Sequence, residues 1–350
     1  MSDYTLIKGT FHVVGFSPDG DSLMFRANNV KNWEKFNTTH RDIFNDRLTQ
    51  NNGAVQLRLQ GIDALETHYS PSSISTPTHL KDKENSRIEK PKAKSYHQPD
   101  FYADKATTVL LNYLGVNKVE WASRWGHSWI DKAWIQHGKK EVVVDDKLAD
   151  AIPGYIITRD IERKGRPISW VFAGKTRSRD GAQLTRSKVA ARIERSGNYH
   201  LLEQGMVYPY FFMTLPAILR SRLIKAVDRA QDRAEKEPNL WTNDRSTRGV
   251  TVKSISKVTG QYEMYPYLFR KLIKHAFRQD ILAYWGALEN DLDSFQPEMD
   301  AVSLSGFFDG GNPYVFLVGE KDFVKLESVL KVTKTRMTLK TKPQNIVFLG

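Results

Sequence analysis

The sequence predicts an α+β protein, with a five-stranded β-barrel and helices in its N-terminal part and a small α+β domain after it. Three observations predict this fold class. Short segments with alternating apolar residues, separated by turns that contain Asp and Gly, indicate β-hairpins in the N-terminal half. Two longer segments, 102–114 and 216–237, repeat apolar residues at helical spacing. A polar stretch at 242–248 then interrupts the pattern, so a domain boundary is expected there.

The barrel strands are expected at segments in which apolar and polar residues alternate. The turn Asp19-Gly20-Asp21 joins the first two strands, because Asp and Gly tolerate the backbone angles of tight turns. The third strand begins at Val55, with Leu57 and Leu59 on the same side. The predicted segments are Tyr4–Phe16, Ser22–Ala27, Val55 onward, a fourth strand that starts at Val119–Trp121, and a hairpin of 155–161 and 168–173. From these segments a five-stranded barrel of the OB-fold type is expected.

Three insertions interrupt this barrel, at about 28–52, 67–100 and 122–153. The second is long, polar and rich in Ser, Pro and Lys. A loop of this length is either functional or disordered, so two interpretations stay open: a mobile arm that contacts a ligand, or a solvated insertion. The third insertion is rich in tryptophan. The tryptophan rings of the stretch 121–134 either stack on a ligand or form a satellite hydrophobic cluster; they are Trp121, Trp125, Trp129 and Trp134.

The chain is expected to hold two domains, 1–245 and 246–350. The second shows an amphipathic helix at 265–285 and a turn at Asp309–Asn312 between two apolar segments, 302–308 and 314–318, which predicts a hairpin. A last strand is expected at 346–349. No catalytic motif is legible in this region, so its function is left open between regulation, targeting and oligomerisation.

The composition favours a polyanionic partner. Lys and Arg number 52 against 40 Asp and Glu, which gives a net charge of +12. A basic surface of this kind suits nucleic acid before membrane. Cysteine is absent, which excludes disulfides and cysteine zinc sites. No leader pattern and no apolar run of about 20 residues is seen, so a cytoplasmic protein is expected.

Charged residues concentrate around three predicted turns. The DGD turn supplies Asp21. The stretch RLQGIDALE places Arg58 five residues before Asp63, with Glu66 three residues further on. The turn of the later hairpin supplies Arg166. Two acids for a hard cation, a third acid beside a water, and two arginines for a phosphate are the parts of a phosphodiesterase site.

These motifs, in this order, resemble the staphylococcal (thermonuclease) nuclease family, which has a DGD turn, an R-x-x-x-x-D-x-x-E block and a YGR turn. The resemblance covers about residues 4–241, and the region after it is not recognised. It implies an SNase-like OB-fold and a metal-dependent endonuclease, a hydrolase acting on ester bonds. In that family's mechanism water attacks phosphorus and the 5′ oxygen leaves.

The resemblance also implies a role for each charged residue. Asp21, Asp63 and the backbone carbonyl of Ala64 would hold one divalent metal ion, with Ca²⁺ favoured and Mg²⁺ or Mn²⁺ as alternatives. Glu66 would orient or deprotonate the attacking water, two roles that the sequence does not separate. Arg58 and Arg166 would clamp the phosphate, because guanidinium stays charged and offers a planar fork.

Further residues near these motifs are compared with the family pattern. Lys164 stands where relatives have a tyrosine, so it keeps phosphate affinity and loses base stacking. Tyr208 and Tyr210 follow a Gln-Gly pair, after which relatives use tyrosines for nucleotide contact. Ala64-Leu65 and Pro167 also depart from the family pattern. His68 is a loop residue or a metal or substrate contact.

The function expected is therefore hydrolysis of DNA, RNA or both. The alternative is an OB-fold module that binds nucleic acid and has lost catalysis. No membrane partner is expected. The region 246–350 would supply a homodimer contact or bind a regulatory protein.

Overall fold

The computed structural model describes residues 4–35, 38–84, 88–124, 127–290, 292 and 302–349. The chain divides into two compact units. The barrel unit comprises residues 1–64 and 104–239, and the second unit comprises 65–103 and 240–350. The boundary near 240 lies close to the expected one. The segment 67–100, expected as an insertion of the first domain, instead belongs to the second unit.

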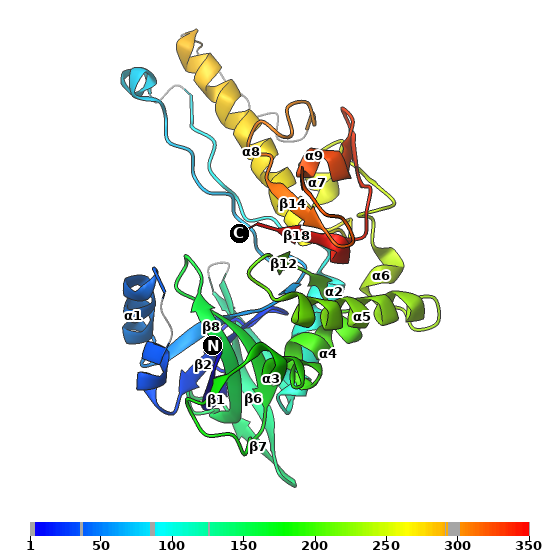
Figure 1. Ribbon diagram of the computed structural model, residues 1–350. Helices are drawn as coiled ribbons and strands as arrows, with labels where there is room; N and C mark the ends of the chain where they lie inside the picture. Colours follow the sequence, from blue (N-terminus) through cyan, green and yellow to red (C-terminus); the bar gives the residue numbers. More distant parts are fainter. Residues whose placement is uncertain are drawn as a thin grey trace. The chain divides into compact units, whose positions relative to one another are not determined.

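The barrel unit contains a closed, mixed barrel of five strands (Figure 1). The strand order is β1-β2-β3-β9-β8, and β8 pairs back onto β1 to close the ring. Neighbours are antiparallel except β3 and β9, which run parallel. The expectation of an OB-like, five-stranded barrel is confirmed. The strands are β1 (Tyr4–His12), β2 (Ser22–Ala27), β3 (Ala54–Leu59), β8 (Ile152–Ile161) and β9 (Pro167–Ala173).

The alternating pattern of β3 explains how it faces the core. Val55, Leu57 and Leu59 are buried, whereas Gln56 and Arg58 are only half-buried. One face of the strand therefore fills the barrel, and burial of such side chains contributes roughly 1.5–3 kcal/mol each. The opposite face carries Arg58 to the barrel rim.

Several helices and short strands of the same unit surround the barrel strands. The longest is α5, whose buried residues recur at three- and four-residue spacing: Leu219, Leu223, Ala226, Val227 and Ala230. The two predicted helices are thus confirmed as α2 and α5. The elements are α2 (Asp100–Tyr113), α3 (Arg186–Ala190), η3 (Ile193–Arg195), α4 (Gly197–Glu203), α5 (Ala217–Arg233), β4 (Ile62–Asp63), β10 (Gln183–Leu184), β11 (Tyr208–Pro209) and β12 (Phe211–Phe212).

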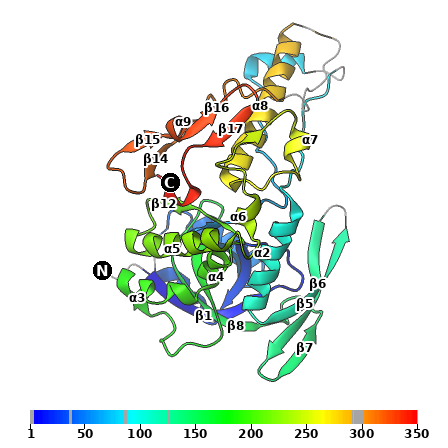
Figure 2. The ribbon, with the colours of Figure 1, turned by 90° about the vertical axis from the view of Figure 1, so that its right-hand side faces the viewer.

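The prediction that Val119–Trp121 starts the fourth barrel strand is wrong. These residues lie in β5 (Val116–Arg124), which pairs with β6 (His127–His137), and β6 pairs with β7 (Lys140–Val144). The three form a separate sheet beside the barrel (Figure 2). The alternation correctly indicated a strand, but the next segment forms a local hairpin with it. The barrel strand begins only at Ile152. The insertion at 28–52 holds η1 (Val30–Lys35) and α1 (Arg41–Gln50).

In the second unit, the long helix α8 (Pro266–Glu289) organises the packing. The apolar stripe expected on it is buried. The segment that follows Glu66 packs against its C-terminal half, where Leu80 and Ile88 join Tyr284, Ala287 and Leu288 in one apolar cluster. The anchoring helix is η2 (Thr78–Lys83). The segment 67–100 is therefore anchored at these two apolar residues, although its composition is polar.

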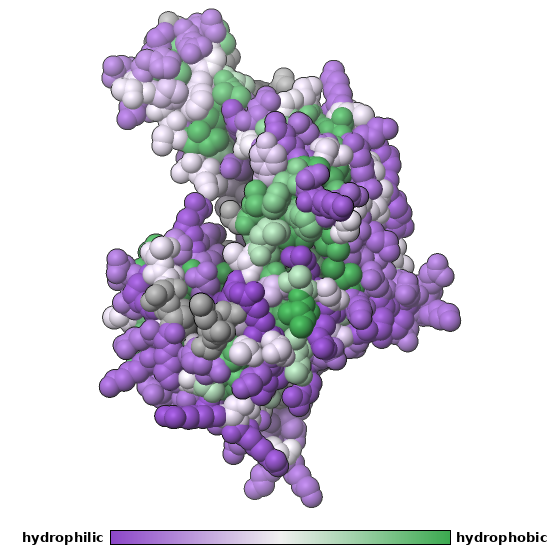
Figure 3. Space-filling model, in the orientation of Figure 1, coloured by the Kyte–Doolittle hydropathy of each residue, from purple (hydrophilic) through white to green (hydrophobic). Residues whose placement is uncertain are grey.

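Two small antiparallel sheets complete the second unit, in the orders β15-β14-β18 and β13-β17-β16. The expected hairpin partner of β14 at 302–308 is not a strand; β14 pairs with β15 and β18 instead. Figure 3 shows hydrophobic residues gathered over β14, where Tyr314 is 49% exposed. The elements are α6 (Leu240–Asn243), β13 (Val250–Thr251), α7 (Ile255–Val258), β14 (Tyr314–Leu317), β15 (Phe323–Lys325), α9 (Leu326–Val329), β16 (Leu330–Val332), β17 (Arg336–Leu339), η4 (Pro343–Asn345) and β18 (Ile346–Phe348). Over the described ranges, no helix has the length and apolarity to cross a bilayer.

Candidate active site

The DGD turn places Asp21 at the start of β2. The backbone N–H of Asp21 donates to Oδ1 of Asp19 at 3.1 Å, which closes the turn. Gly20 lies so close to its neighbours that a Cβ there would stand 2.7 Å from Cβ of Ala106 and 2.9 Å from Cβ of Ala64. Glycine is therefore what lets this turn approach the chain that follows β4.

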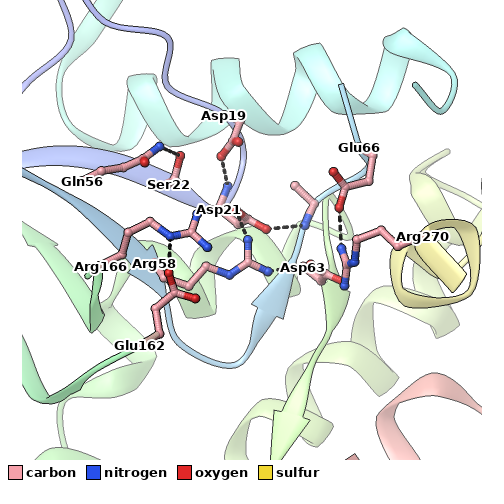
Figure 4. Close-up of polar contacts among 11 residues, drawn as sticks. Asp19, Asp21, Ser22, Gln56, Arg58, Asp63, Glu66, Glu162, Arg166 and Arg270 are labelled. Carbon is pink, nitrogen blue, oxygen red and sulfur yellow. Dashed lines mark hydrogen bonds and ion pairs between the residues drawn. The ribbon is translucent and has the colours of Figure 1, made fainter. Parts of the chain in front are cut away.

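Arg58 joins two buried carboxylates. Its Nη1 lies 2.5 Å from Oδ1 of Asp21, and its Nη2 lies 2.6 Å from Oδ1 of Asp63 (Figure 4). Ser22 pairs with Arg58 across β2 and β3, so the strand register carries Asp21 to the arginine. Gly61, with a φ of +81°, turns the chain from β3 into β4 and returns Asp63 to it. Asp21, Arg58 and Asp63 thus form one compact charged group.

The two acids are held in a desolvated position. Asp21 is 4% exposed and Asp63 is fully buried, while the Arg58 side chain is 21% exposed. Burial raises the pKa of Asp21 to about 7; the Arg58 cation opposes the rise, and the neighbouring carboxylates of Asp19 and Asp63 add to it. The N–H of Ala64 donates to the second oxygen of Asp21 at 3.1 Å. When both acids ionise, two negative charges share one cation.

This donor set fits a hard divalent cation. Asp21 and Asp63 present carboxylate oxygens, the ligands that Ca²⁺ and Mg²⁺ prefer, and their summed charge exceeds that of Arg58. Within the described ranges, no group of three or more Asp, Glu, His or Cys side chains is arranged to hold a metal. An ion here would therefore take two carboxylates from the barrel unit and fill its remaining positions with backbone oxygen, water or phosphate.

Arg166 lies at the end of the barrel where β9 begins. The turn from Glu162 to Arg166 is closed by backbone hydrogen bonds, and Nε of Arg166 lies 2.6 Å from Oε1 of Glu162. Strand β9 runs parallel to β3, with Ile168 opposite Arg58. Figure 4 shows the Arg166 side chain beside that of Arg58. Arg58 on β3 and Arg166, one residue before β9, are thus on neighbouring segments of the barrel.

Glu66 belongs to the second unit. Its backbone N–H donates to Oε1 of Gln98 at 3.2 Å, and its carbonyl accepts from the Gln98 N–H at 2.7 Å. Its carboxylate forms an ion pair with Arg270 of α8. The sequence reasoning missed Gln98 and Arg270, because both are remote from the motifs and neither belongs to a recognisable pattern.

The other residues predicted to contact the substrate differ in their exposure to solvent. Lys164 is exposed in its turn, as a phosphate contact would require. Tyr208 is fully buried and pairs with Asp63 across β11 and β4, so its ring does not face solvent. Tyr210 is half-buried, and its N–H donates to the carbonyl of Gly61 at 3.1 Å. His68 is exposed and contacts Thr67.

No protein-family model matches this chain, and a search of curated proteins finds no match. The barrel unit brings together two acids, the arginine that contacts both, and a second arginine one residue before the adjacent strand. Such a group can neutralise an anionic oxygen, which is one requirement for reaction at a phosphate.

Proposed function

We propose that this protein is a metal-dependent nuclease that hydrolyses phosphodiester bonds of DNA, RNA or both. One observation carries the proposal: Arg58 lies between two buried carboxylates, Asp21 and Asp63, at the rim of an OB-like barrel. The order of the motifs around these residues, similar to that of the staphylococcal nuclease family, supports the same function. The net charge of +12 suits a polyanionic substrate.

Each residue receives a role in this proposal. Arg58 and Arg166 bind phosphate oxygens and neutralise the negative charge that develops on these oxygens in the transition state. Glu66 holds the attacking water or takes its proton. Asp21 and Asp63, with the carbonyl of Ala64, hold the cation, which when bound supplies Lewis-acid stabilisation of the phosphate. The new oxygen–phosphorus bond forms as the bond to the 5′ oxygen breaks. Lys164 and Tyr210 are assigned secondary substrate contacts.

A cleavage assay tests the proposal. The substrates are circular single-stranded DNA, linear duplex DNA and RNA, each with EDTA, Ca²⁺, Mg²⁺ or Mn²⁺. We expect metal-dependent cleavage that Glu66→Gln and Arg58→Ala lower by about 10²-fold or more. Cleavage of circles would establish endonuclease activity. Wild-type rates in both variants would contradict the site assignment.

A second function is favoured by the same ion pairs. Because Arg58 contacts both carboxylates, it already neutralises part of the charge that would attract a metal ion. The residues would then be a structural bridge in an OB-fold module that only binds nucleic acid. Binding that persists in EDTA, without cleavage under any of the metals, would support this alternative over the nuclease.

A further inference from the structure

Glu66 is fixed to the second unit through its backbone. Gln98 is fully buried. Its side-chain oxygen accepts from the backbone N–H of Glu66, and its backbone N–H donates to the carbonyl of Glu66. Its side-chain N–H donates to the carbonyl of Met264 at 2.7 Å. Met264 lies two residues before α8 begins. The main chain at Glu66 is thereby tied to the start of that helix.

The side chain of Glu66 is fixed by the same helix. Arg270, in the second turn of α8, forms an ion pair with Oε1 of Glu66 (Figure 4). Both side chains are about one-fifth exposed, at 20% and 21%. Ion pairs that are shielded in this way are screened less by solvent than surface pairs. The contact therefore restricts the rotamers of a carboxylate that would otherwise sample several.

The surroundings of this pair are also ordered by packing. Tyr69 exchanges backbone hydrogen bonds of 2.7 and 2.9 Å with Tyr96. Burial raises the pKa of the Tyr69 phenol, while the Arg270 cation opposes the rise and the Glu66 carboxylate adds to it. The neighbours of Arg270 on α8, Phe269 and Leu272, are buried. The arginine therefore projects from a helix that the core of the second unit holds in place.

We infer that Arg270 is a positioning residue for Glu66. The inference rests on the proposed function, in which Glu66 handles the attacking water. A catalytic group must be held to within a fraction of an ångström of its working position, so a fixed partner raises the rate of the chemical step.

The test compares three arginine variants on the DNA and RNA substrates with Ca²⁺ or Mg²⁺. We expect Arg270→Gln to lower kcat by roughly 10- to 100-fold with KM within about twofold of the wild-type value, because substrate binding is untouched. Arg270→Lys should recover part of kcat, since ammonium keeps the charge and loses the planar fork. Arg278→Gln removes the same charge two turns further along α8 and should keep the wild-type kcat.

Several outcomes would overturn this role. An unchanged kcat in Arg270→Gln, beside a large loss in Glu66→Gln, would refute the inference and leave the proposed function intact. A raised kcat would show that the arginine inhibits Glu66. Equal losses in Arg270→Gln and Arg278→Gln would show a general charge effect on substrate binding. No cleavage by the wild-type protein would refute the proposed function and this role with it.

A thermal double-mutant cycle tests the contact without any activity. Unfolding temperatures are measured for the wild type, Arg270→Gln, Glu66→Gln and the double variant. We expect the effects of the two single changes to be non-additive, because each removes one partner of the same pair. Additive effects would show that Arg270 does not hold Glu66, and would overturn the inference independently of the cleavage result.

Discussion

Arg58 donates to Asp21 across the β2–β3 pairing, with 2.5 Å between Nη1 and Oδ1. The contact is a consequence of register, because Ser22, the residue after Asp21, is the strand partner of Arg58. It joins the first and second of the sequence motifs into one group. The same guanidinium also reaches Asp63, so its loss would leave two acids side by side in a buried position.

Replacing Arg58 by alanine should therefore destabilise the barrel unit. Removing one partner of a buried ion pair costs about 3–5 kcal/mol, and the partial exposure of Arg58 places the expected loss near the lower end. Urea unfolding at neutral pH in EDTA measures it. The exposed Arg26, on β2, gives the matched control, and Arg26→Ala should change the free energy of unfolding by less than about 0.5 kcal/mol. Equal stabilities for the two variants would show that the bridge is unimportant.

The protonation of Asp21 should make stability depend on pH. Because burial raises the pKa of Asp21 to about 7, above the value of about 3.9 in an unfolded chain, the folded state binds this proton more tightly. Its stabilising contribution is complete below about pH 4 and is lost as the pH rises through about 7. Asp21→Asn cannot ionise, so in EDTA its free energy of unfolding should fall less over this window, by an amount on the order of a few kcal/mol.

The control for this titration is Asp131→Asn, since Asp131 is an exposed acid of the same unit. Denaturant unfolding at a series of pH values compares both variants with the wild type. The Asp131→Asn profile should follow that of the wild type. A wild-type profile that Asp21→Asn leaves unchanged would contradict the assignment of this proton to Asp21.

The barrel could be predicted because its information is local. Alternation marks β3, and the motif Asp19-Gly20-Asp21 marks the turn before β2. The partner of a strand is a less local property. Val119–Trp121 alternates as a barrel strand would, but pairs with the hairpin that directly follows it. The alternating pattern predicts that a strand forms, but it does not identify the strand with which it pairs.

The contact of Glu66 with Arg270 could not be predicted for the same reason. The two residues are separated by 204 positions, and Arg270 stands in an ordinary amphipathic helix. Likewise, the polar composition of 67–100 gave no indication that the segment packs against α8. Two apolar residues, Leu80 and Ile88, make that contact. Short motifs therefore predict the charged residues of the site. The residues that hold them in position come from segments distant in the sequence.

Metal binding should compete with the proton on Asp21. A divalent cation needs the ionised carboxylate, so binding releases the proton and strengthens as the pH rises through about 7. We expect Ca²⁺ to raise the unfolding temperature more at pH 8 than at pH 6, because ligand binding to the folded state adds stability. Thermal shift measurements test this, with Asp63→Asn as the variant that loses the effect. The same shift in Asp63→Asn would place the bound ion elsewhere.

Replacing Gly20 by alanine should disturb the site without removing any charge. A Cβ at this position would meet the side chains of Ala106 and Ala64 at distances that real side chains do not adopt. The turn must then move away from the chain after β4, and we expect a loss of about 1–3 kcal/mol in unfolding free energy. Because Asp21 moves with the turn, cleavage should fall as well, which a nuclease assay on folded protein measures.

Gly286→Ala is the matched control: nothing lies within 4 Å of its added Cβ, and alanine in helix α8 should stabilise by up to about 1 kcal/mol. A Gly20→Ala variant with wild-type stability and rate would show that the turn does not need this close approach.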